Sequence, residues 1–329
     1  MATEKGWKIT SLSPEMGGGK IPLPSARLKK SKYEKPLSRG PGLLTTLSAV
    51  LRLVRFEHAL MFALSVFIAE VIASSGIPAF TLVLLISLMV PVLSEMAAFA
   101  LNDLLDMRTD RINKKEGRPL VSGELTPNFA LALAAVSLAG ATVLSYLISM
   151  QIFILTLAIN ALALLYNAKL KDLPLAGNLY IAFTMGIPFL FGNLAVSPVL
   201  SAPNIFIALM GFLAGLAREI VKTCEDVEGD ARARKSKTLP MLIGMKPSLW
   251  LAGIIYALFV LCSIVPFHLY LKVGIGFAVV LAADLIFGYS SLMLIFSRHR
   301  LSFLATSRKI TLAGLFLGLA GILLAVLGH

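Results

Sequence analysis

The chain of 329 residues is poor in charged residues and in cysteine. Charged residues make up 15% of it, hydrophobic residues make up 57%, and the mean hydropathy is +0.84. A soluble protein of this length does not need so much apolar sequence for its core. The two cysteines, Cys224 and Cys262, fit neither a disulfide framework nor a metal site. These shortages argue against a soluble domain and against a disulfide-stabilised secreted scaffold.

Long apolar runs recur along most of the chain. About 20 residues suffice to cross the hydrocarbon layer of a bilayer. Buried helices of a large soluble protein would not give so many such runs in series. The predicted fold is therefore an all-α integral membrane protein, a bundle of transmembrane helices around a central cavity. Nine spans are predicted, at roughly 58–75, 79–101, 127–148, 151–168, 174–196, 204–224, 248–267, 270–296 and 307–328.

Basic residues lie almost entirely on one side of this predicted bundle. Spans in series alternate sides, and 29 of the 30 Lys and Arg residues fall in the N-terminal region or in loops on that same side. Only Lys272 lies near a turn on the other side. Because positive residues stay in the cytoplasm, that side is predicted to be cytoplasmic. The net charge of +12 then reflects orientation and attraction to anionic lipid or phosphate, and does not indicate nucleic-acid binding.

The first 42 residues differ from the rest in composition. They are rich in Lys, Ser, Pro and Gly, have few large apolar residues and contain no stretch of signal-peptide type. We expect 1–42 to be a flexible basic cytoplasmic tail and 43–329 to be the transmembrane domain.

Two acid-rich stretches stand at the cytoplasmic ends of predicted spans. Asn102, Asp106 and Asp110 are spaced by four residues, as are Asp226 and Asp230, so each set falls on one helical face. Ionised carboxylates are costly beside a bilayer and mark function by default. Clustered oxygen ligands suit a hard cation such as Mg²⁺, which is usually shared with a substrate phosphate. The pattern predicts an enzyme that handles a phosphorylated lipid at the membrane surface.

Cations accompany both acidic stretches. Each stretch is followed by a basic loop that contains a proline, Pro119 in the first and Pro240 in the second. Arg218 and Lys222 precede Asp226 on the same stripe of residues four apart. Carboxylates that hold Mg²⁺, together with Lys or Arg that neutralise the remaining charge, are what a diphosphate needs. The two blocks also make the halves of the chain a weak internal repeat.

These motifs resemble those of the UbiA superfamily of intramembrane prenyltransferases. The family's first motif, Asn-Asp-x-x-Asp-x-x-x-Asp, stands at 102–110, and its second, Asp-x-x-x-Asp, stands at 226–230. The resemblance covers roughly 50–329 and includes the nine spans.

Within the family, three stretches look most like the archaeal digeranylgeranylglyceryl phosphate synthases. They are 111–123, 166–178 and 218–230. One departure, Arg-Phe-Glu-His at 55–58, looks more like the aromatic-acid prenyltransferases of the 4-hydroxybenzoate branch.

The resemblance implies a mechanism and a role for each motif residue. Two Mg²⁺ ions would bridge the diphosphate of an isoprenyl donor, and stabilisation of the leaving pyrophosphate would drive transfer. The implied metal ligands are Asn102, Asp103, Asp106, Asp110, Asp226 and Asp230, with Asp103 on a neighbouring face. The implied catalytic set is the same without Asp103 and with Lys222. The residues expected on the diphosphate are Arg118, Tyr166, Lys169 and Lys222.

The acceptor is expected to be either a lipid or a phenolic acid. Transfer of geranylgeranyl to geranylgeranylglyceryl phosphate is the main expectation, and prenylation of 4-hydroxybenzoate or a related acid is the alternative. Arg52 and Arg55 either bind an acceptor phosphate or carboxylate or anchor the helix at the headgroups. His58 is either an acceptor-site base or a packing histidine.

Three further acidic residues lie within predicted spans. Glu95 is seven residues before Asn102 and shares its face, so it either orients a ligand or base or is a protonated structural carboxyl. For Glu70 and Asp284 the structural role is favoured.

Two other protein classes also place polar groups inside a bundle. A membrane transporter does so beside Gly and Pro, as at 186–188, but does not need two Asp-x-x-x-Asp blocks on one side. A non-catalytic isoprenoid-binding scaffold does not need an intact set of metal ligands.

Overall fold

The computed structural model describes residues 42–112, 114–227, 230–231, 238–296 and 301–328. The predicted tail at 1–42 lies outside these residues except for Gly42. Within the described ranges the chain is helical and contains no strand.

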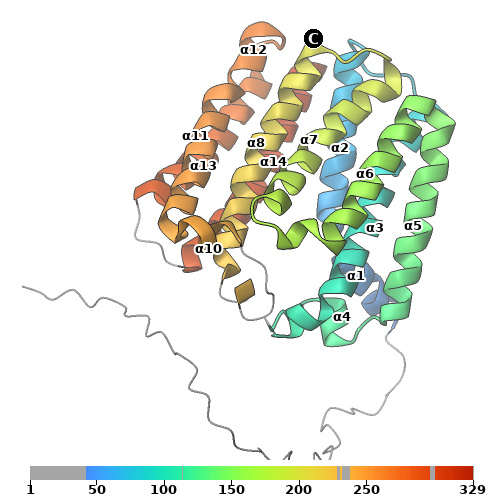
Figure 1. Ribbon diagram of the computed structural model, residues 1–329. Coiled ribbons are helices and arrows are strands. Elements are labelled where there is room, and N and C mark those ends of the chain that lie inside the picture. Colours follow the sequence, from blue (N-terminus) through green and yellow to red (C-terminus); the bar gives the residue numbers. More distant parts are fainter. Residues whose placement is uncertain (1–41, 113, 228–229, 232–237, 297–300, 329) are drawn as a thin grey trace, which may run out of the picture. The chain divides into compact units, whose positions relative to one another are not determined.

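Long helices cross the bundle side by side (Figure 1). They are α2 (Phe56–Ala73), α3 (Leu82–Ile112), α5 (Pro127–Ile148), α6 (Met150–Ala168), α7 (Ala176–Val196), α8 (Ala202–Glu225), α11 (Met245–Ser263), α13 (Ile275–Phe296) and α14 (Leu301–Leu327). The short helices are α1 (Leu43–Leu53), α4 (Pro119–Ser122), η1 (Leu170–Asp172), α10 (Leu239–Ile243) and α12 (Val265–Leu269).

The predicted spans agree with these helices. Among the described residues, nine helices are long and apolar enough to cross a membrane, and each overlaps one predicted span. The largest difference is in α3, which runs to Ile112 although its span was predicted to end near 101. Its apolar part ends there, but the helix continues through the first acidic motif. The amphipathic helix α1, which precedes the first span, was not predicted.

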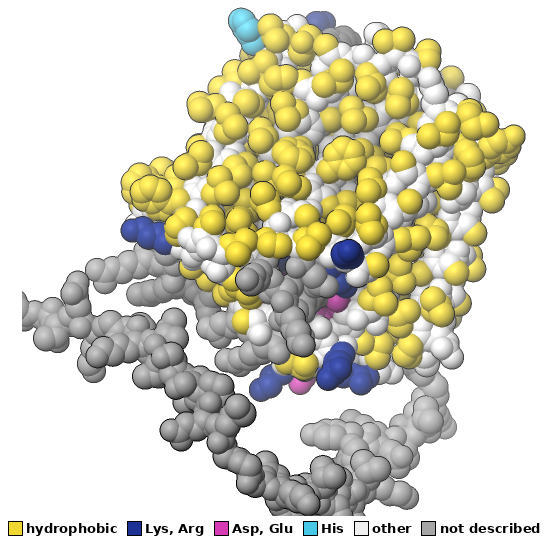
Figure 2. All heavy atoms as spheres, in the orientation of Figure 1, with side chains coloured by type: hydrophobic (Ala, Val, Ile, Leu, Met, Phe, Trp, Pro, Cys, Tyr) yellow, Lys and Arg dark blue, Asp and Glu magenta, His cyan; other side chains and the backbone are white. Residues whose placement is uncertain are grey.

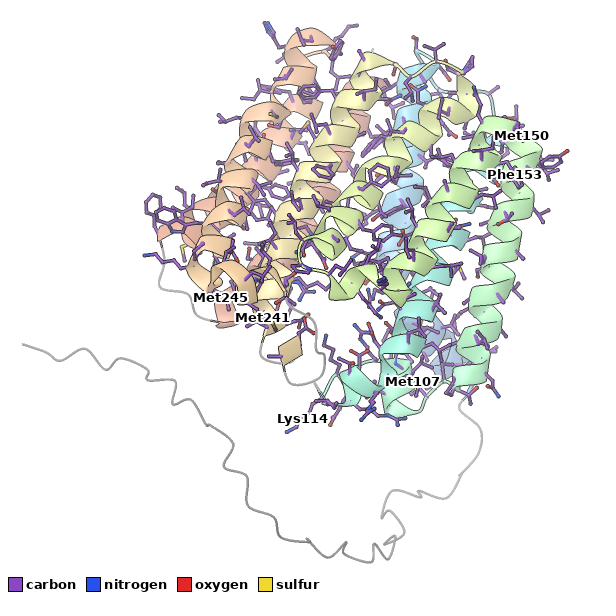
Figure 3. All side chains as sticks on the ribbon, in the orientation of Figure 1. Met107, Lys114, Met150, Phe153, Met241 and Met245 are labelled. Atoms are coloured by element: carbon purple, nitrogen blue, oxygen red, sulfur yellow. The ribbon has the colours of Figure 1, made fainter. Side chains whose placement is uncertain are left out.

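Apolar and charged side chains separate along the bundle. Figure 2 shows a broad hydrophobic face over the middle of the molecule, with most of the visible Lys, Arg, Asp and Glu at its lower edge. Figure 3 places Met150 and Phe153 at the upper end of α6 and Met107 and Lys114 at the opposite end of the bundle. This separation is expected of a protein whose surface meets hydrocarbon and then headgroups.

Helices α7 and α8 pack at very short range. A Cβ atom at Gly186 would lie 2.6 Å from the carbonyl oxygen of Ala208, and one at Gly211 would lie 2.6 Å from that of Met185. Only glycine permits this approach, as is common between membrane helices. The pairing also lets the Asn178 side chain of α7 donate to Thr223 of α8 at 2.9 Å. It therefore fixes the wall that carries the second acidic motif.

Candidate active site

A cavity of about 620 Å³ lies inside the bundle. Residues of α2, α3, α6, α7, α8, α11, α13 and α14 line it. Its wall is apolar over much of its length, with side chains such as Phe62, Phe189, Phe287 and Leu319, and carries both acidic motifs. An apolar hollow with a few polar groups is the usual form of a binding site for a largely hydrocarbon ligand.

The first motif lies on one face of α3. Asn102, Asp106 and Asp110 all line the cavity, as their spacing of four residues predicts, because α3 remains a regular helix through them. Asp103 lies outside the cavity lining and is buried. It accepts from Arg55 at 3.2 Å and from Arg118 at 2.6 Å, so it holds these two cations in place.

Each carboxylate of this motif has a cationic neighbour. Arg118 bridges Asp103 and Asp110, at 2.6 Å from an oxygen of each. Lys171 donates to Asp106 at 2.7 Å. Charge pairing of this kind is what permits three carboxylates to be buried within eight residues of one helix.

The second motif begins where α8 ends. Asp226 is the C-terminal cap of α8, and its backbone N–H donates to the carbonyl of Lys222 at 2.9 Å. The N–H of Asp230 donates to the carbonyl of Asp226 at 2.9 Å, so the helical spacing continues. Both aspartates line the cavity. The basic loop at 232–237 lies outside the described residues.

The two motifs meet around one ammonium group. Lys115 Nζ lies 3.9 Å from a carboxylate oxygen of Asp110 and 3.7 Å from one of Asp226. A cation is thus already held between the two motifs. Among the described residues, no three acidic, His or Cys side chains converge on a single point. The donors around the ammonium are nonetheless carboxylate oxygens, with the amide of Asn102 in the same cavity wall, and this chemistry fits Mg²⁺.

Three of the four residues predicted to contact a diphosphate line the cavity. They are Arg118, Tyr166 and Lys222. Lys169, the fourth, is exposed and is not part of the lining. The reason is local, because α6 ends there and the chain turns through η1, which directs Lys171 toward Asp106 instead.

The residues expected to bind the acceptor also differ in whether they line the cavity. Arg55 and His58 line the cavity, whereas Arg52 points away and pairs with Glu124, also donating to the carbonyl of Gly117 at 3.3 Å. Burial lowers the pKa of Arg55, and the neighbouring carboxylate of Asp103 opposes that shift. Arg55 also has a left-handed backbone, with φ of 47°, where the chain turns from α1 into α2.

The acidic residues inside the spans differ in whether they line the cavity and in their hydrogen-bond partners. Glu95 lines the cavity. Glu70 does not, and it accepts from Ser87 of α3, so it joins two helices. Asp284 accepts from Ser263 at 2.6 Å, and this pair lies in the cavity wall.

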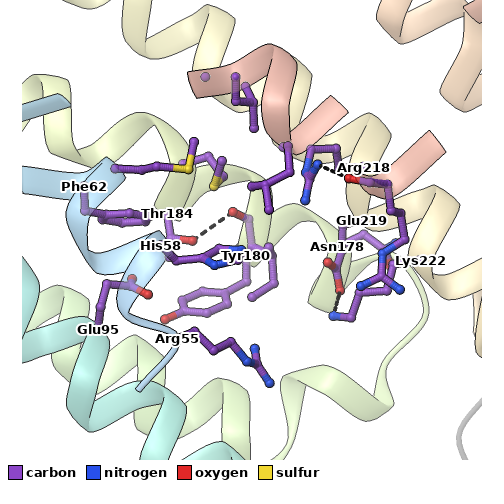
Figure 4. Close-up of a pocket in the computed structure, with 18 of the residues that line it drawn as sticks. Arg55, His58, Phe62, Glu95, Asn178, Tyr180, Thr184, Arg218, Glu219 and Lys222 are labelled. Atoms are coloured by element: carbon purple, nitrogen blue, oxygen red, sulfur yellow. Dashed lines mark hydrogen bonds and ion pairs between the residues drawn. The ribbon is translucent and has the colours of Figure 1, made fainter. Parts of the chain in front are cut away.

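Several polar cavity residues were not predicted from the sequence. Figure 4 shows Arg55, His58 and Glu95 on one side of the cavity and Arg218, Glu219 and Lys222 on the other. Lys171 lies in a stretch whose resemblance to relatives was noted, so comparison within that stretch could have found it. Arg308 offered no such signal, because it enters the site from α14, far along the chain. Among the unpredicted residues are Lys115, Lys171, Tyr180, Glu219 and Arg308.

Known proteins resemble this chain along most of its length. The model of the UbiA prenyltransferase family matches residues 60–302. The digeranylgeranylglyceryl phosphate synthase of Archaeoglobus fulgidus is 38% identical over 283 residues, which cover 84% of this chain and 94% of the relative. The synthase of the same name from Thermococcus kodakarensis is 31% identical over 252 residues, or 77% of this chain and 88% of the relative.

Solved structures show the same fold. A structure of a digeranylgeranylglyceryl phosphate synthase in membranes matches with a TM-score of 0.66 and 28% identity, over 86% of this chain and 99% of that one. A UbiA homologue from Archaeoglobus fulgidus bound to DMAPP and Mg²⁺ matches with a TM-score of 0.57 and 20% identity, over 83% and 98%. The resemblance and the nine-helix bundle predicted from the sequence are confirmed. This multi-pass membrane protein belongs to the UbiA prenyltransferase family.

Proposed function

We propose that this prenyltransferase transfers the geranylgeranyl group of geranylgeranyl diphosphate to a hydroxyl of geranylgeranylglyceryl phosphate. The observation that carries the proposal is the meeting of the two aspartate motifs around Lys115 beside an apolar cavity. Such a site suits a donor with a diphosphate at one end and a long hydrocarbon at the other. The acceptor follows from the relatives named as digeranylgeranylglyceryl phosphate synthases, which this chain matches over most of their length.

The aspartate motifs are assigned to metal binding. Asn102, Asp106 and Asp110 would hold one Mg²⁺, and Asp226 and Asp230 a second. Held by these residues, Mg²⁺ would supply positive charge to stabilise the leaving diphosphate oxygen. Because Asp103 is committed to Arg55 and Arg118, its role is to position those cations rather than to bind metal.

The diphosphate is assigned to the cations at the same end of the cavity. Arg118, Lys171 and Lys222 line it together with Tyr166. Lys171 takes the place that the sequence had given to Lys169. Charge-assisted hydrogen bonds from these groups would orient the diphosphate and neutralise what the metal leaves uncompensated.

The transfer forms one bond and breaks another at C1 of the donor. The C1–oxygen bond breaks and its electron pair leaves with pyrophosphate, while the acceptor hydroxyl oxygen bonds to C1. We assign the proton of that hydroxyl to Glu95, a carboxylate of the cavity wall. Arg55 and His58, near Glu95, would orient the acceptor. The apolar wall would exclude water, which would otherwise trap the allylic cation.

The orientation in the membrane follows from charge. By the alternation of spans along the sequence, both motifs fall on the side that carries 29 of the 30 Lys and Arg residues. We therefore assign the N-terminus and the motif loops to the cytoplasm.

An acceptor competition tests the proposal. Purified protein in detergent with labelled geranylgeranyl diphosphate and Mg²⁺ is offered geranylgeranylglyceryl phosphate and 4-hydroxybenzoate together, and the products are separated by mass. A second reaction contains EDTA in place of Mg²⁺. We expect the diether phosphate as the product, one pyrophosphate released per transfer, and no turnover with EDTA.

Each contrary outcome has a distinct meaning. A prenylated 4-hydroxybenzoate would replace the lipid acceptor with an aromatic one and make the Arg-Phe-Glu-His stretch at 55–58 the informative feature. Formation of the diether without added metal would refute the role of the two motifs but leave the acceptor assignment intact.

A further inference from the structure

Arg218 is a cavity-lining cation that the proposed mechanism does not use. It lies within α8, and its Nη1 donates to the backbone carbonyl of Arg308 at 2.8 Å and to the hydroxyl of Thr311 at 3.0 Å. Both acceptors are neutral. A guanidinium carries five N–H donors, so these two contacts through one nitrogen leave most of its capacity for other partners.

The other cavity cations differ from Arg218 in having acidic partners. Among the residues that the structure describes, Arg218 has no carboxylate within ion-pair distance. A charge held inside a membrane bundle needs a counterion. The ion pairs of the other cavity cations are Arg55–Asp103, Lys115–Asp110, Lys115–Asp226, Arg118–Asp103, Arg118–Asp110, Lys171–Asp106, Lys222–Glu219 and Arg308–Glu225.

The position of Arg218 separates it from the metal end of the cavity. It precedes Asp226 by eight residues, which is about 12 Å along a helix, and Lys222 lies between them. A diphosphate held by metal at Asp226 is therefore neutralised by nearer cations. Arg218 instead lies across the cavity from Arg55 and His58, and all three side chains line it (Figure 4).

The chemistry of the transfer requires a second anion in this region. The acceptor hydroxyl must approach C1 from the side away from the leaving pyrophosphate. The acceptor phosphate, joined to that hydroxyl through the short glycerol backbone, is then also displaced from the metal end. Arg55 is already paired with Asp103 at 3.2 Å, a carboxylate that it shares with Arg118. Among the described cavity cations, Arg218 is the one without an ion pair, so an entering anion would be its counterion.

We infer that Arg218 binds the phosphate monoester of the acceptor and so selects a phosphorylated over an unphosphorylated lipid alcohol. This inference rests on the proposed function, because it presumes a glyceryl phosphate acceptor. Arg218 fits the task since a guanidinium can donate two parallel hydrogen bonds to a phosphate. Its contacts with Arg308 and Thr311 fix the orientation of the side chain in advance.

The test compares two acceptors in three proteins. Geranylgeranylglyceryl phosphate and geranylgeranylglycerol, which lacks only the phosphate, are offered to the wild type, to Arg218→Gln and to Lys309→Gln. Lys309 is an exposed neighbour of Arg308 outside the cavity lining, so its variant removes one positive charge without touching the site. Initial rates give kcat and KM for each acceptor and for geranylgeranyl diphosphate.

We expect Arg218→Gln to lower kcat/KM for the phosphorylated acceptor by about 10- to 100-fold, the usual worth of a hydrogen bond to a charged group. The rate with geranylgeranylglycerol and the KM for the donor should stay at their wild-type values, and Lys309→Gln should match the wild type throughout. Arg218→Lys, which keeps the charge but loses the bidentate geometry, should fall between the two. Unchanged donor KM also shows that the variant cavity has folded.

Two results would overturn the inference. One is an unchanged preference for the phosphorylated acceptor in Arg218→Gln. The other is a rise in donor KM that matches the rise in acceptor KM, which would place Arg218 on the donor diphosphate or in a structural role. Failure of the wild type to use geranylgeranylglyceryl phosphate at all would instead refute the proposed function, so the two failures are distinguishable.

Discussion

The two aspartate motifs differ in how the backbone presents them. The first lies within α3, a helix of 31 residues that continues past it, and its carboxylates are nearly inaccessible, with Asp103 and Asp110 about 3% and 2% exposed. The second begins at the C-terminal cap of α8, and the Asp226 side chain is 24% exposed. One motif is thus built into a rigid wall, and the other stands at a helix end.

The two motifs also differ in the ion pairs that their carboxylates make, and the backbone explains this difference. Carboxylates buried on a continuous helix must be neutralised in place, and Arg118 and Lys171 do this for the first motif. Among the residues that the structure describes, the ion-pair partner of Asp226 is Lys115, at the longer distance of 3.7 Å. We conclude that the fold fixes the side chains of the first motif in place before a ligand binds. The side chains of the second motif are the ones that can most readily move when metal and diphosphate bind.

Removal of a carboxylate from either motif should have the largest effect. Asp106→Ala and Asp226→Ala are each expected to lower kcat at least about 100-fold, because the remaining oxygens cannot hold the metal in place. Steady-state rates at saturating Mg²⁺ measure this, and unfolding in detergent checks that both variants are folded. Normal turnover in both variants would eliminate the metal role, and normal turnover in Asp226→Ala alone would limit it to α3.

Glu95 tests whether α3 supplies a proton acceptor as well as metal ligands. Glu95→Gln preserves shape but removes the base, so kcat should fall about 100-fold with little change in donor KM. The control is Glu70→Gln, which alters a carboxyl bonded to Ser87 outside the cavity and should leave kcat close to the wild-type value. Equal kcat values for Glu95→Gln and the wild type would remove Glu95 from the mechanism.

Removal of a cation should lower the free energy of unfolding by different amounts beside the first motif and beside the second. Arg118→Gln leaves two buried carboxylates without their shared partner, and we expect it to lower the free energy of unfolding by about 2 to 3 kcal/mol. Lys222→Gln, whose side chain is 37% exposed and pairs with Glu219, should cost less than about 1 kcal/mol. Denaturation in mixed micelles compares the two. Equal losses would mean that the buried pairing at the first motif stabilises the protein no more than the exposed ion pair that precedes the second.

The smallest effect is expected at the surface, where Arg52 pairs with Glu124 after the first motif. Hydrogen bonds from Arg52 and Ser122 lower the pKa of Glu124. A carboxyl whose pKa falls on folding stabilises the protein above its unfolded pKa, and that contribution disappears as the pH falls through the folded value. Arg52→Gln should therefore cost under about 1 kcal/mol at pH 7 and nothing at low pH. Unfolding measured across pH, with and without salt, tests this, and a loss that persists at low pH would mean that the pair is not responsible.

Much of the fold could be predicted because few kinds of backbone structure are stable inside a bilayer. Spans must be long, apolar and helical, so nine were found from hydropathy alone, and each corresponds to a helix of the structure. Helix α1 was not predicted because at 11 residues it is too short to span. The predicted span stops near 101, where hydropathy falls, while the helical spacing of the first motif agrees with the continuation of α3 to Ile112.

The sequence by itself determined the class of the protein, the two motifs and their helical faces, because spacing of four along a helix fixes which side chains share a wall. Only the tertiary structure decided which cations serve them. Lys115 and Arg118 come from the loop after α3, and Lys171 comes from the turn after α6. The choice of Lys171 over Lys169 depends on where α6 ends and how the chain turns. The neutral partners of Arg218 depend on the packing of α8 against α14. Such contacts join residues far apart in sequence, and no local pattern encodes them.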